Sequence, residues 1–164
     1  MRIPEVSRLK DLKRKMGTYV LIFNLESGCR LSVGKLGRFE FPVGWYAYTG
    51  SARGPGGLTA RLGHHLRIAA NPHWHMDFLR PQGSIIEIWY GHDPAFDEHI
   101  WAEVMQAMAG TLTVAPGFGS SDCRCNTHLI HFATQPTVDL FRRRQNMRTE
   151  KRRQPVFRLP IHDV

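Results

Sequence analysis

The first third of the chain consists of extended apolar runs separated by turn residues. "TYVLIFNL" (residues 18–25) is a β-rich run, apolar apart from its ends, that stops at the turn "ESG". "CRLSVG" (29–34) alternates apolar and polar positions, as in a strand buried on one face. After the turn "GKLGRF", the segment "EFPVGWYAYTG" (40–50) resumes an extended, aromatic pattern. These segments predict an antiparallel meander of about three strands.

A glycine-rich turn, "RGPGG", and a short amphipathic helix follow the last of these strands. The helix is expected over residues 57–67, where three leucines repeat at helical spacing and form an apolar stripe. Arg61 and His65 lie one turn apart along the edge of that stripe. Two side chains in these positions can reach one ligand at the sheet on which the helix packs.

The next segments predict another strand and a longer helix. "SIIEIWY" (84–90) is the strand, and the helix has Asp93 as its N-cap, Pro94 at its first position and Gly110 beyond its end. Glu103 lies at the margin of the apolar face of this helix. A carboxylate there must be solvated, paired or bound to a cation, and the pattern alone favours a structural role over a functional one.

Basic residues are concentrated at the two ends of the chain. The net charge is +8, of which residues 1–16 carry +4 and the segment from Arg142 onward carries +6, so the part between them carries −2. We therefore divide the 164 residues into a basic N-terminal extension (1–16), one compact domain (17–140) and a basic C-terminal tail (141–164), both ends being flexible. Such ends attract polyanions, because phosphate contacts release counterions; the alternative is that they only improve solubility.

Composition excludes several classes of protein. With 42% hydrophobic residues the chain is not wholly disordered. No segment approaches the roughly 20 apolar residues of a membrane span, and the N-terminus lacks the apolar stretch of a secretion signal. The three cysteines are too few for a disulfide framework. These features indicate a cytoplasmic protein, without a membrane partner, whose thiols are reduced or bind a metal.

Five residues carry the side chains that phosphodiester hydrolysis requires: Tyr19, Tyr48, Arg61, His65 and Glu103. The reaction needs an activated water, positive groups for the phosphoryl oxygens, and protonation or metal stabilisation of the leaving oxygen. Glu103 can hold one hard divalent ion, Mg²⁺ or Mn²⁺, and Arg61 offers a planar fork that matches phosphate. A tyrosine or the histidine can transfer the proton. The alternative is that the tyrosines are core aromatics of the sheet.

Polar side chains in the loops are further candidates for binding nucleic acid or phosphate. In "HWHMDF", His73, His75 and Asp77 are ligands of a metal or phosphate or, with equal weight, the polar face of an edge strand. In "GFGSSDCRCNTHL", glycines and hydroxyls allow backbone amides to approach an anion. Cys123, Cys125 and His128 offer three zinc ligands without a fourth, so a structural loop, with the aspartate of the motif capping backbone amides, is favoured over zinc. The full set of binding candidates is Lys35, Ser51, Arg53, His73, His75, Ser120, Ser121, Asp122, Cys123, Cys125 and His128.

Motifs in three parts of the chain resemble those of the GIY-YIG nuclease superfamily. "GTY" (17–19) and "YTG" (48–50) resemble its two signature tripeptides. "VGKLGRFEFPVGWYAYTGSARGPGGLTARLGHHLR", "HWHMDFL" and "GFGSSDCRCNTHL" are similar to a poorly characterised GIY-YIG-like family whose members occur alone or fused to an endonuclease III type DNA glycosylase. The similarity covers about residues 17–132. It implies an α/β (α+β) fold, with a central antiparallel sheet of three or more strands flanked by helices, and a one-metal phosphodiesterase site.

The resemblance assigns a role to each of the five candidate residues. Tyr19 and Tyr48 match the tyrosines of the two motifs, and Arg61 matches the phosphate-contacting arginine. His65 matches a histidine found one turn further in some branches, and Glu103 the metal-binding glutamate. Two features depart from the pattern: "RGPGG" lengthens the spacing between Tyr48 and Arg61, and the late asparagine of some members has only Asn126 as its nearest counterpart.

Three functions follow in order of preference. The first is a metal-dependent endonuclease, or a nuclease-like DNA repair or processing factor. The second is a nucleic-acid-binding module that keeps the fold without catalysis, favoured by the basic ends. The third is an interaction protein that docks a repair partner through the apolar end of the chain, "RLPIHDV".

Overall fold

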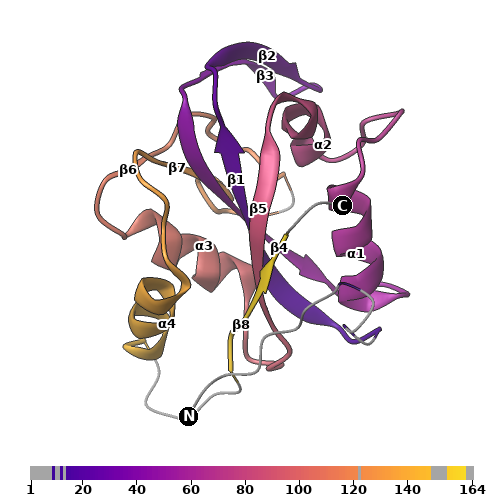
Figure 1. Ribbon diagram of the computed structural model, residues 1–164, viewed down its shortest axis with the longest axis vertical. Coiled ribbons are helices and arrows are strands. Elements are labelled where there is room, and N and C mark those ends of the chain that lie inside the picture. The colour runs from indigo at the N-terminus through magenta and orange to yellow at the C-terminus, as the bar shows by residue number, and fades with distance from the viewer. Residues whose placement is uncertain (1–8, 10–11, 13, 122, 149–154, 162–164) are drawn as a thin grey trace.

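An antiparallel sheet runs through the middle of the molecule (Figure 1). The computed structural model describes residues 9, 12, 14–121, 123–148 and 155–161. In this part of the chain the sheet has the strand order β6-β7-β4-β1-β5-β8, and no helix is long and apolar enough to cross a membrane. The elements are β1 (Gly17–Leu25), β2 (Cys29–Val33), β3 (Gly37–Phe41), β4 (Gly44–Ala52), α1 (Gly57–Leu66), α2 (His75–Leu79), the 3₁₀ helix η2 (Arg80–Gln82), β5 (Ser84–Gly91), α3 (Glu98–Gln106), β6 (Thr111–Leu112), β7 (Leu129–Phe132), α4 (Val138–Asn146) and β8 (Phe157–Pro160).

Strands β1 and β4 lie at the centre of the sheet because both of their faces are apolar. In β1, Tyr19, Leu21 and Phe23 point to one face, and Val20 and Ile22 point to the other. Helices α1 and α2 contribute to the core on the first face, and α3 and α4 to the core on the second (Figure 1). The predicted α+β class, with a central antiparallel sheet flanked by helices, is confirmed.

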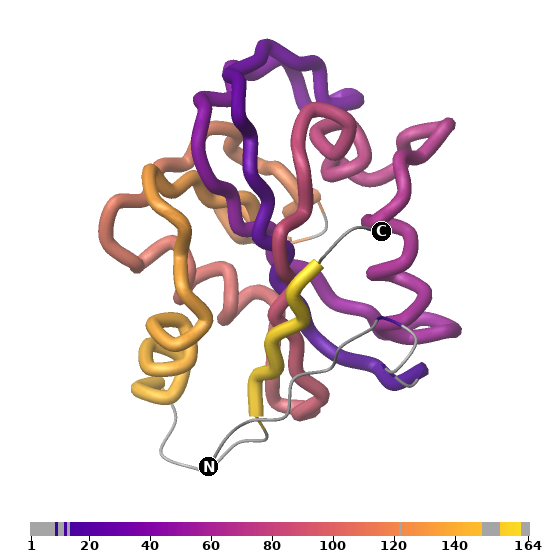
Figure 2. The backbone as a smooth tube through the Cα atoms, in the orientation of Figure 1, coloured from indigo at the N-terminus to yellow at the C-terminus, as the bar shows by residue number. Residues whose placement is uncertain are grey.

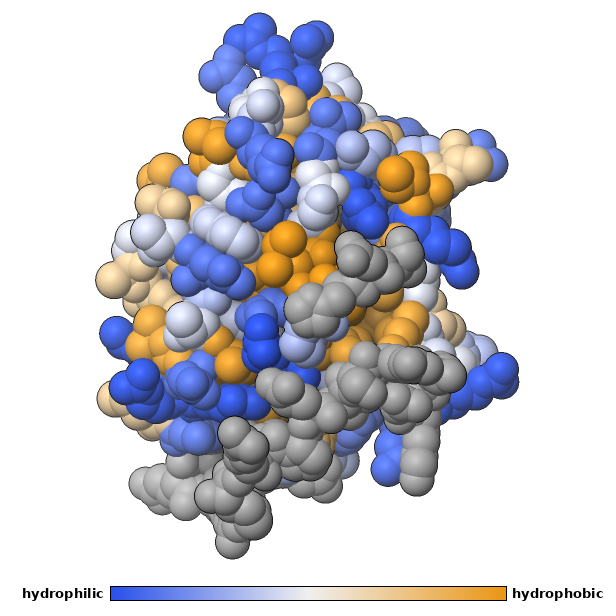
Figure 3. Space-filling model, viewed as in Figure 1, coloured by the Kyte–Doolittle hydropathy of each residue, from blue (hydrophilic) through white to orange (hydrophobic). Residues whose placement is uncertain are grey.

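The β2–β3 hairpin stands apart from this sheet. β4 pairs with β1 along its whole length, from Gly17 opposite Ala52 to Leu25 opposite Gly44, whereas β2 and β3, within the described part of the chain, pair only with each other. The predicted meander is therefore wrong in its connectivity. The hairpin forms the hydrophilic tip at the top of Figure 3, consistent with its pattern of alternating exposed positions.

Both predicted tails contribute to the folded core. Leu12 is buried, and the Leu58 N–H donates to the carbonyl of Lys15. In the C-terminal segment, α4 buries Phe141, and β8 pairs with β5, beside which it runs in Figure 2. The prediction of flexible ends is thus corrected for the described residues. Buried apolar residues within both basic segments, Leu12, Phe141 and Leu159, anchor them to the rest of the fold.

Helix α1 confirms the predicted helix, whereas α3 begins later than expected. Asp97, rather than Asp93, is the N-cap of α3 and accepts the N–H of His99 at 2.7 Å. Asp93 accepts the N–H of Ala95 in the turn before the helix. This shift places Glu98 in the first turn of α3.

Candidate functional site

Two tyrosines and a histidine meet on the face of the sheet that α1 covers. Tyr19 on β1 and Tyr48 on β4 lie on the same face, because Tyr48 pairs with Leu21, two residues from Tyr19. Tyr19 Oη lies 2.8 Å from Nε2 of His65, and the rings of His65 and Tyr48 are 5.8 Å apart. All three side chains are buried. We call Tyr19, Tyr48 and His65 the tyrosine–histidine centre.

Two glycines make room for the phenol rings. Gly50 lies opposite Tyr19, and a Cβ atom on it would lie 2.4 Å from the Tyr19 hydroxyl oxygen. Gly119, in the loop between β6 and β7, has a φ of +71°, and a Cβ atom on it would lie 2.8 Å from Cε2 of Tyr48. Backbone therefore approaches both rings at distances that only glycine allows.

Arg61 brings a fixed positive charge to the edge of this centre. Its guanidinium carbon lies 4.2 Å from the centroid of the Trp74 ring, a cation–π contact that orients the fork. Arg61 and Trp74 line a pocket of about 230 Å³ with His64 and residues of the glycine-rich turn. A second pocket, of about 120 Å³, is also lined by Trp74, together with Tyr48.

A buried carboxylate holds Trp74, which lines both pockets, in place. Asp77 is 4% exposed, accepts the backbone N–H groups of His73 and Trp74 at 2.9 and 3.0 Å, and lies 2.8 Å from Nε2 of His64. The segment is the short helix α2, not an edge strand, because this carboxylate satisfies the free N–H groups at the start of a helix. The sequence indicated Asp77 as a candidate ligand of a metal or phosphate but did not reveal that it braces Trp74.

Burial keeps the centre uncharged near neutral pH. Burial, aided by Tyr48, raises the pKa of Tyr19 well above its usual range, and the charge of Arg61 opposes this only in part. Burial and the negative charge of Glu98 also raise the pKa of Tyr48. Burial and the neighbouring imidazole of His64 lower the pKa of His65 to about 3. Both phenols keep their protons, so Tyr48 presents a neutral hydroxyl to the smaller pocket, while Arg61 carries the positive charge at the larger one.

Glu103, the predicted metal ligand, does not face the tyrosine–histidine centre. Its side chain is 60% exposed and accepts two hydrogen bonds from Arg148 at 3.1 Å. Glu98 instead acts on both phenols and raises the pKa of each. Five residues along an α-helix correspond to about 140° of rotation, so Glu98 and Glu103 point in different directions. Glu98 is the carboxylate that the sequence analysis missed.

Some of the predicted loop residues lie around the smaller pocket. His73, His75 and Ser121 line it together with Tyr48, and His75 Nδ1 accepts the N–H of Gly119 at 2.8 Å. His73 has an exposed side chain, and His75 is half-buried at the start of α2. These three are the loop candidates that the structure brings to the centre.

The other predicted binding residues are dispersed. Ser51 follows Gly50 on β4 and so points to the opposite face from Tyr19. Arg53 donates to the carbonyl of Phe96, and Lys35 is exposed in the turn of the hairpin. Ser120 is buried and its hydroxyl has no partner among the described residues. Asp122 lies outside the described residues, and Asn126, whose carbonyl accepts the N–H of Gly117, is exposed.

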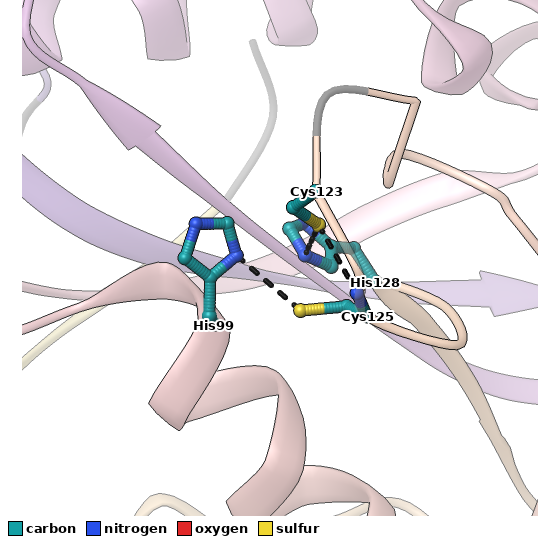
Figure 4. Close-up of side chains that lie close together, drawn as sticks. All are labelled: His99, Cys123, Cys125 and His128. Atoms are coloured by element: carbon teal, nitrogen blue, oxygen red, sulfur yellow. Dashed lines mark hydrogen bonds between the residues drawn. The ribbon is translucent and has the colours of Figure 1, made fainter.

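The loop cysteines and histidine meet a fourth side chain that the sequence did not reveal. Cys123, Cys125 and His128 lie against His99 from the first turn of α3 (Figure 4). We call these four residues the histidine–cysteine cluster. Its place at the end of the sheet, beside Glu98, puts it next to the tyrosine–histidine centre.

Fold and site together define a class: a small α+β protein whose central antiparallel sheet carries a buried tyrosine–histidine centre and an arginine-lined pocket. The family model described as "Domain of unknown function DUF123" matches residues 18–149, and the chain belongs to the DUF123 family. No curated protein and no solved structure was found to match the chain. The resemblance to the GIY-YIG superfamily is corrected by this result, because the matching family is DUF123 and no GIY-YIG family matches.

Proposed function

We propose that the protein is a metal-dependent phosphodiesterase that cuts nucleic acid, with DNA as the first substrate to test. The observation that supports this most strongly is the convergence of the Tyr19–His65 hydrogen bond, the Tyr48 phenol and the Arg61 guanidinium beside two open pockets. Cleavage of a phosphodiester requires proton-transferring groups next to a fixed positive charge. A net charge of +8 favours a polyanionic substrate.

Arg61 and Tyr48 are the groups that contact the substrate in this proposal. Arg61 lines the larger pocket, and its contact with Trp74 keeps the guanidinium fork oriented for a phosphate. Tyr48 lines the smaller pocket, so its phenol can reach a bound phosphate. Tyr19 and His65 lie behind these groups and act as positioning residues for the Tyr48 ring.

Glu98 is the carboxylate available to a divalent cation. Its side chain is 28% exposed, and its charge acts on both phenols of the centre. A bound Mg²⁺ or Mn²⁺ supplies charge stabilisation for the phosphoryl oxygens, and such ions use one or two carboxylates together with water. The structure thus favours Glu98 over Glu103 for this role.

A nucleic-acid-binding module without catalysis is the second candidate. Burial raises the pKa of both Tyr19 and Tyr48, so both phenols resist ionisation near neutral pH. A centre that only donates hydrogen bonds to a phosphate, beside the charge of Arg61, binds nucleic acid without cutting it.

A matched pair of glutamate variants on α3 tests the proposal. The full chain is incubated with single-stranded, duplex, flap and junction DNA in the presence of Mg²⁺ or Mn²⁺, and again with a chelator. We expect Glu98→Gln to lower the cleavage rate by about 10²–10³-fold, the loss typical of one charge-stabilising group. Glu103→Gln, which removes an exposed ion pair with Arg148, is expected to stay within about twofold of wild type.

The outcomes separate the two candidates. Salt-dependent binding by the wild type without cleavage of any substrate would support the binding module. An equal loss in Glu98→Gln and Glu103→Gln would refute the assignment of Glu98. Because Glu98 also lies 3.9 Å from His128, bound metal is measured in every variant.

A further inference from the structure

The histidine–cysteine cluster joins α3 to the loop between β6 and β7. His99 comes from the helix, and Cys123, Cys125 and His128 come from the loop; Figure 4 shows the four side chains gathered at one point. Each residue offers one ligand atom, and these atoms all lie within 4.8 Å of one another. Two segments that are separate in the sequence therefore present one compact set of soft ligands.

The separations fit a tetrahedral metal ion. Zinc–sulfur bonds of about 2.3 Å and zinc–nitrogen bonds of about 2.0–2.1 Å place tetrahedral sulfur and nitrogen ligands about 3.6 Å apart. Cys123 Sγ lies 3.4 Å from His128 Nε2, and Cys125 Sγ lies 3.3 Å from His99 Nδ1. Two thiolates with two imidazoles are a set that zinc adopts in structural sites, whereas Mg²⁺ prefers oxygen ligands.

The surroundings of His128 point independently to a ligand. Its side chain is 2% exposed, and its second ring nitrogen, Nδ1, lies 3.9 Å from Oε2 of Glu98 without a hydrogen-bond partner among the described residues. Zinc-bound histidines commonly present their second nitrogen to a carboxylate, which orients the ring. Among the described residues, the Nε2 atom of this buried imidazole has only a weak hydrogen-bonding contact, with the Cys123 sulfur at 3.4 Å.

We propose that His99, Cys123, Cys125 and His128 bind one zinc ion in tetrahedral coordination, and that the ion ties the loop to α3. This inference goes beyond the proposed phosphodiesterase function and does not depend on it. The cluster has four protein ligands and so leaves no open position for a substrate, which indicates a structural role for the ion.

The first test is the metal content of the full chain, purified with its thiols reduced from cells supplied with zinc. We expect one zinc ion per chain, retained on dialysis against a mild chelator. Cys125→Ser is expected to retain about a tenth or less of this amount. Cys29→Ser is the matched control, because Cys29 lies on β2 outside the cluster, and it is expected to retain the full amount. Replacement by Co²⁺ in the wild type should give the absorption bands of tetrahedral thiolate coordination.

A second measurement keeps the inference testable if Cys125→Ser does not fold. The wild type is melted with and without a strong chelator, and the zinc-bound form is expected to have the higher Tm. Reduced wild type that holds no zinc and no Co²⁺, or Cys125→Ser that retains as much zinc as wild type, would overturn the inference. Cleavage is not the readout: zinc-containing protein that cuts nothing counts against the proposed function alone, and zinc-free protein that cuts counts against this inference alone.

Discussion

Replacing each tyrosine of the tyrosine–histidine centre by phenylalanine separates a structural phenol from a functional one. Tyr19 Oη lies 2.8 Å from His65 Nε2, and Nδ1 of this 2% exposed imidazole already has no partner among the described residues. Tyr19→Phe leaves both ring nitrogens unbonded, which is expected to cost about 1–3 kcal/mol of unfolding free energy. The Tyr48 hydroxyl makes no hydrogen bond to a described residue, so Tyr48→Phe is expected to change stability by no more than about 0.5 kcal/mol.

Urea denaturation at neutral pH measures this difference. With an m value of roughly 2 kcal/mol/M, Tyr19→Phe should lower the midpoint by about 0.5–1.5 M, and Tyr48→Phe by less than about 0.3 M. The proposed function adds a contrast, because Tyr48→Phe should then lose cleavage while keeping its stability. Equal midpoints for the two variants would refute the assignment of the buried hydrogen bond to Tyr19, and unchanged cleavage in Tyr48→Phe would refute its contact with the substrate.

Three further changes test the surroundings of the centre. Asp77→Asn should cost about 2 kcal/mol of unfolding free energy at pH 7. Hydrogen bonds from His73, His64 and Trp74 outweigh burial and lower the pKa of Asp77, so the stabilisation by this carboxylate is full above pH 3.8 and is lost below that pH. The acid limb of a stability–pH profile should therefore be shallower in the variant. Gly119→Ala, at a φ of +71°, should cost about 1–3 kcal/mol in denaturation experiments. Burial lowers the pKa of His65 from 6.5 to about 3. Between these two pH values the wild-type stability should therefore fall as the pH drops, and His65 should contribute at most about 1.4 kcal/mol per pH unit to this fall. The stability of His65→Gln should decrease less steeply over the same range.

The layers of the fold could be predicted from the sequence, but the strand pairing could not. Apolar residues on both faces mark β1 and β4 as central strands, and leucines at helical spacing mark α1. Local patterns do not show which strands pair, so the pairing of β4 with β1, past the β2–β3 hairpin, was not foreseen. Likewise, the apolar residues at the end of the chain were expected to dock a partner, and their pattern did not show that β8 pairs with β5.

Site residues that lie on one face of a single helix could be predicted from the sequence. Residues whose role depends on the rotation of a helix, or on contacts between distant segments, were missed. Arg61 and His65 follow from one helical turn on α1. The metal-binding carboxylate was assigned to Glu103, about 140° further around α3, and so Glu98 was missed. His99 lies 26 positions before Cys125, and nothing in either segment alone links the two.

A single glycine connects the tyrosine–histidine centre to the histidine–cysteine cluster. A Cβ atom on Gly119 would lie 2.8 Å from Cε2 of Tyr48 and 3.1 Å from Cβ of His128. The backbone N–H of Gly119 donates to the His75 ring. Gly117 and Gly119 both have positive φ, so ordering this loop costs conformational entropy that an ion held by four ligands can offset. Loss of the ion should therefore also change the position of Gly119 against Tyr48 in the smaller pocket. Removal of the Tyr48 hydroxyl should leave zinc content unchanged, because this phenol is not a ligand.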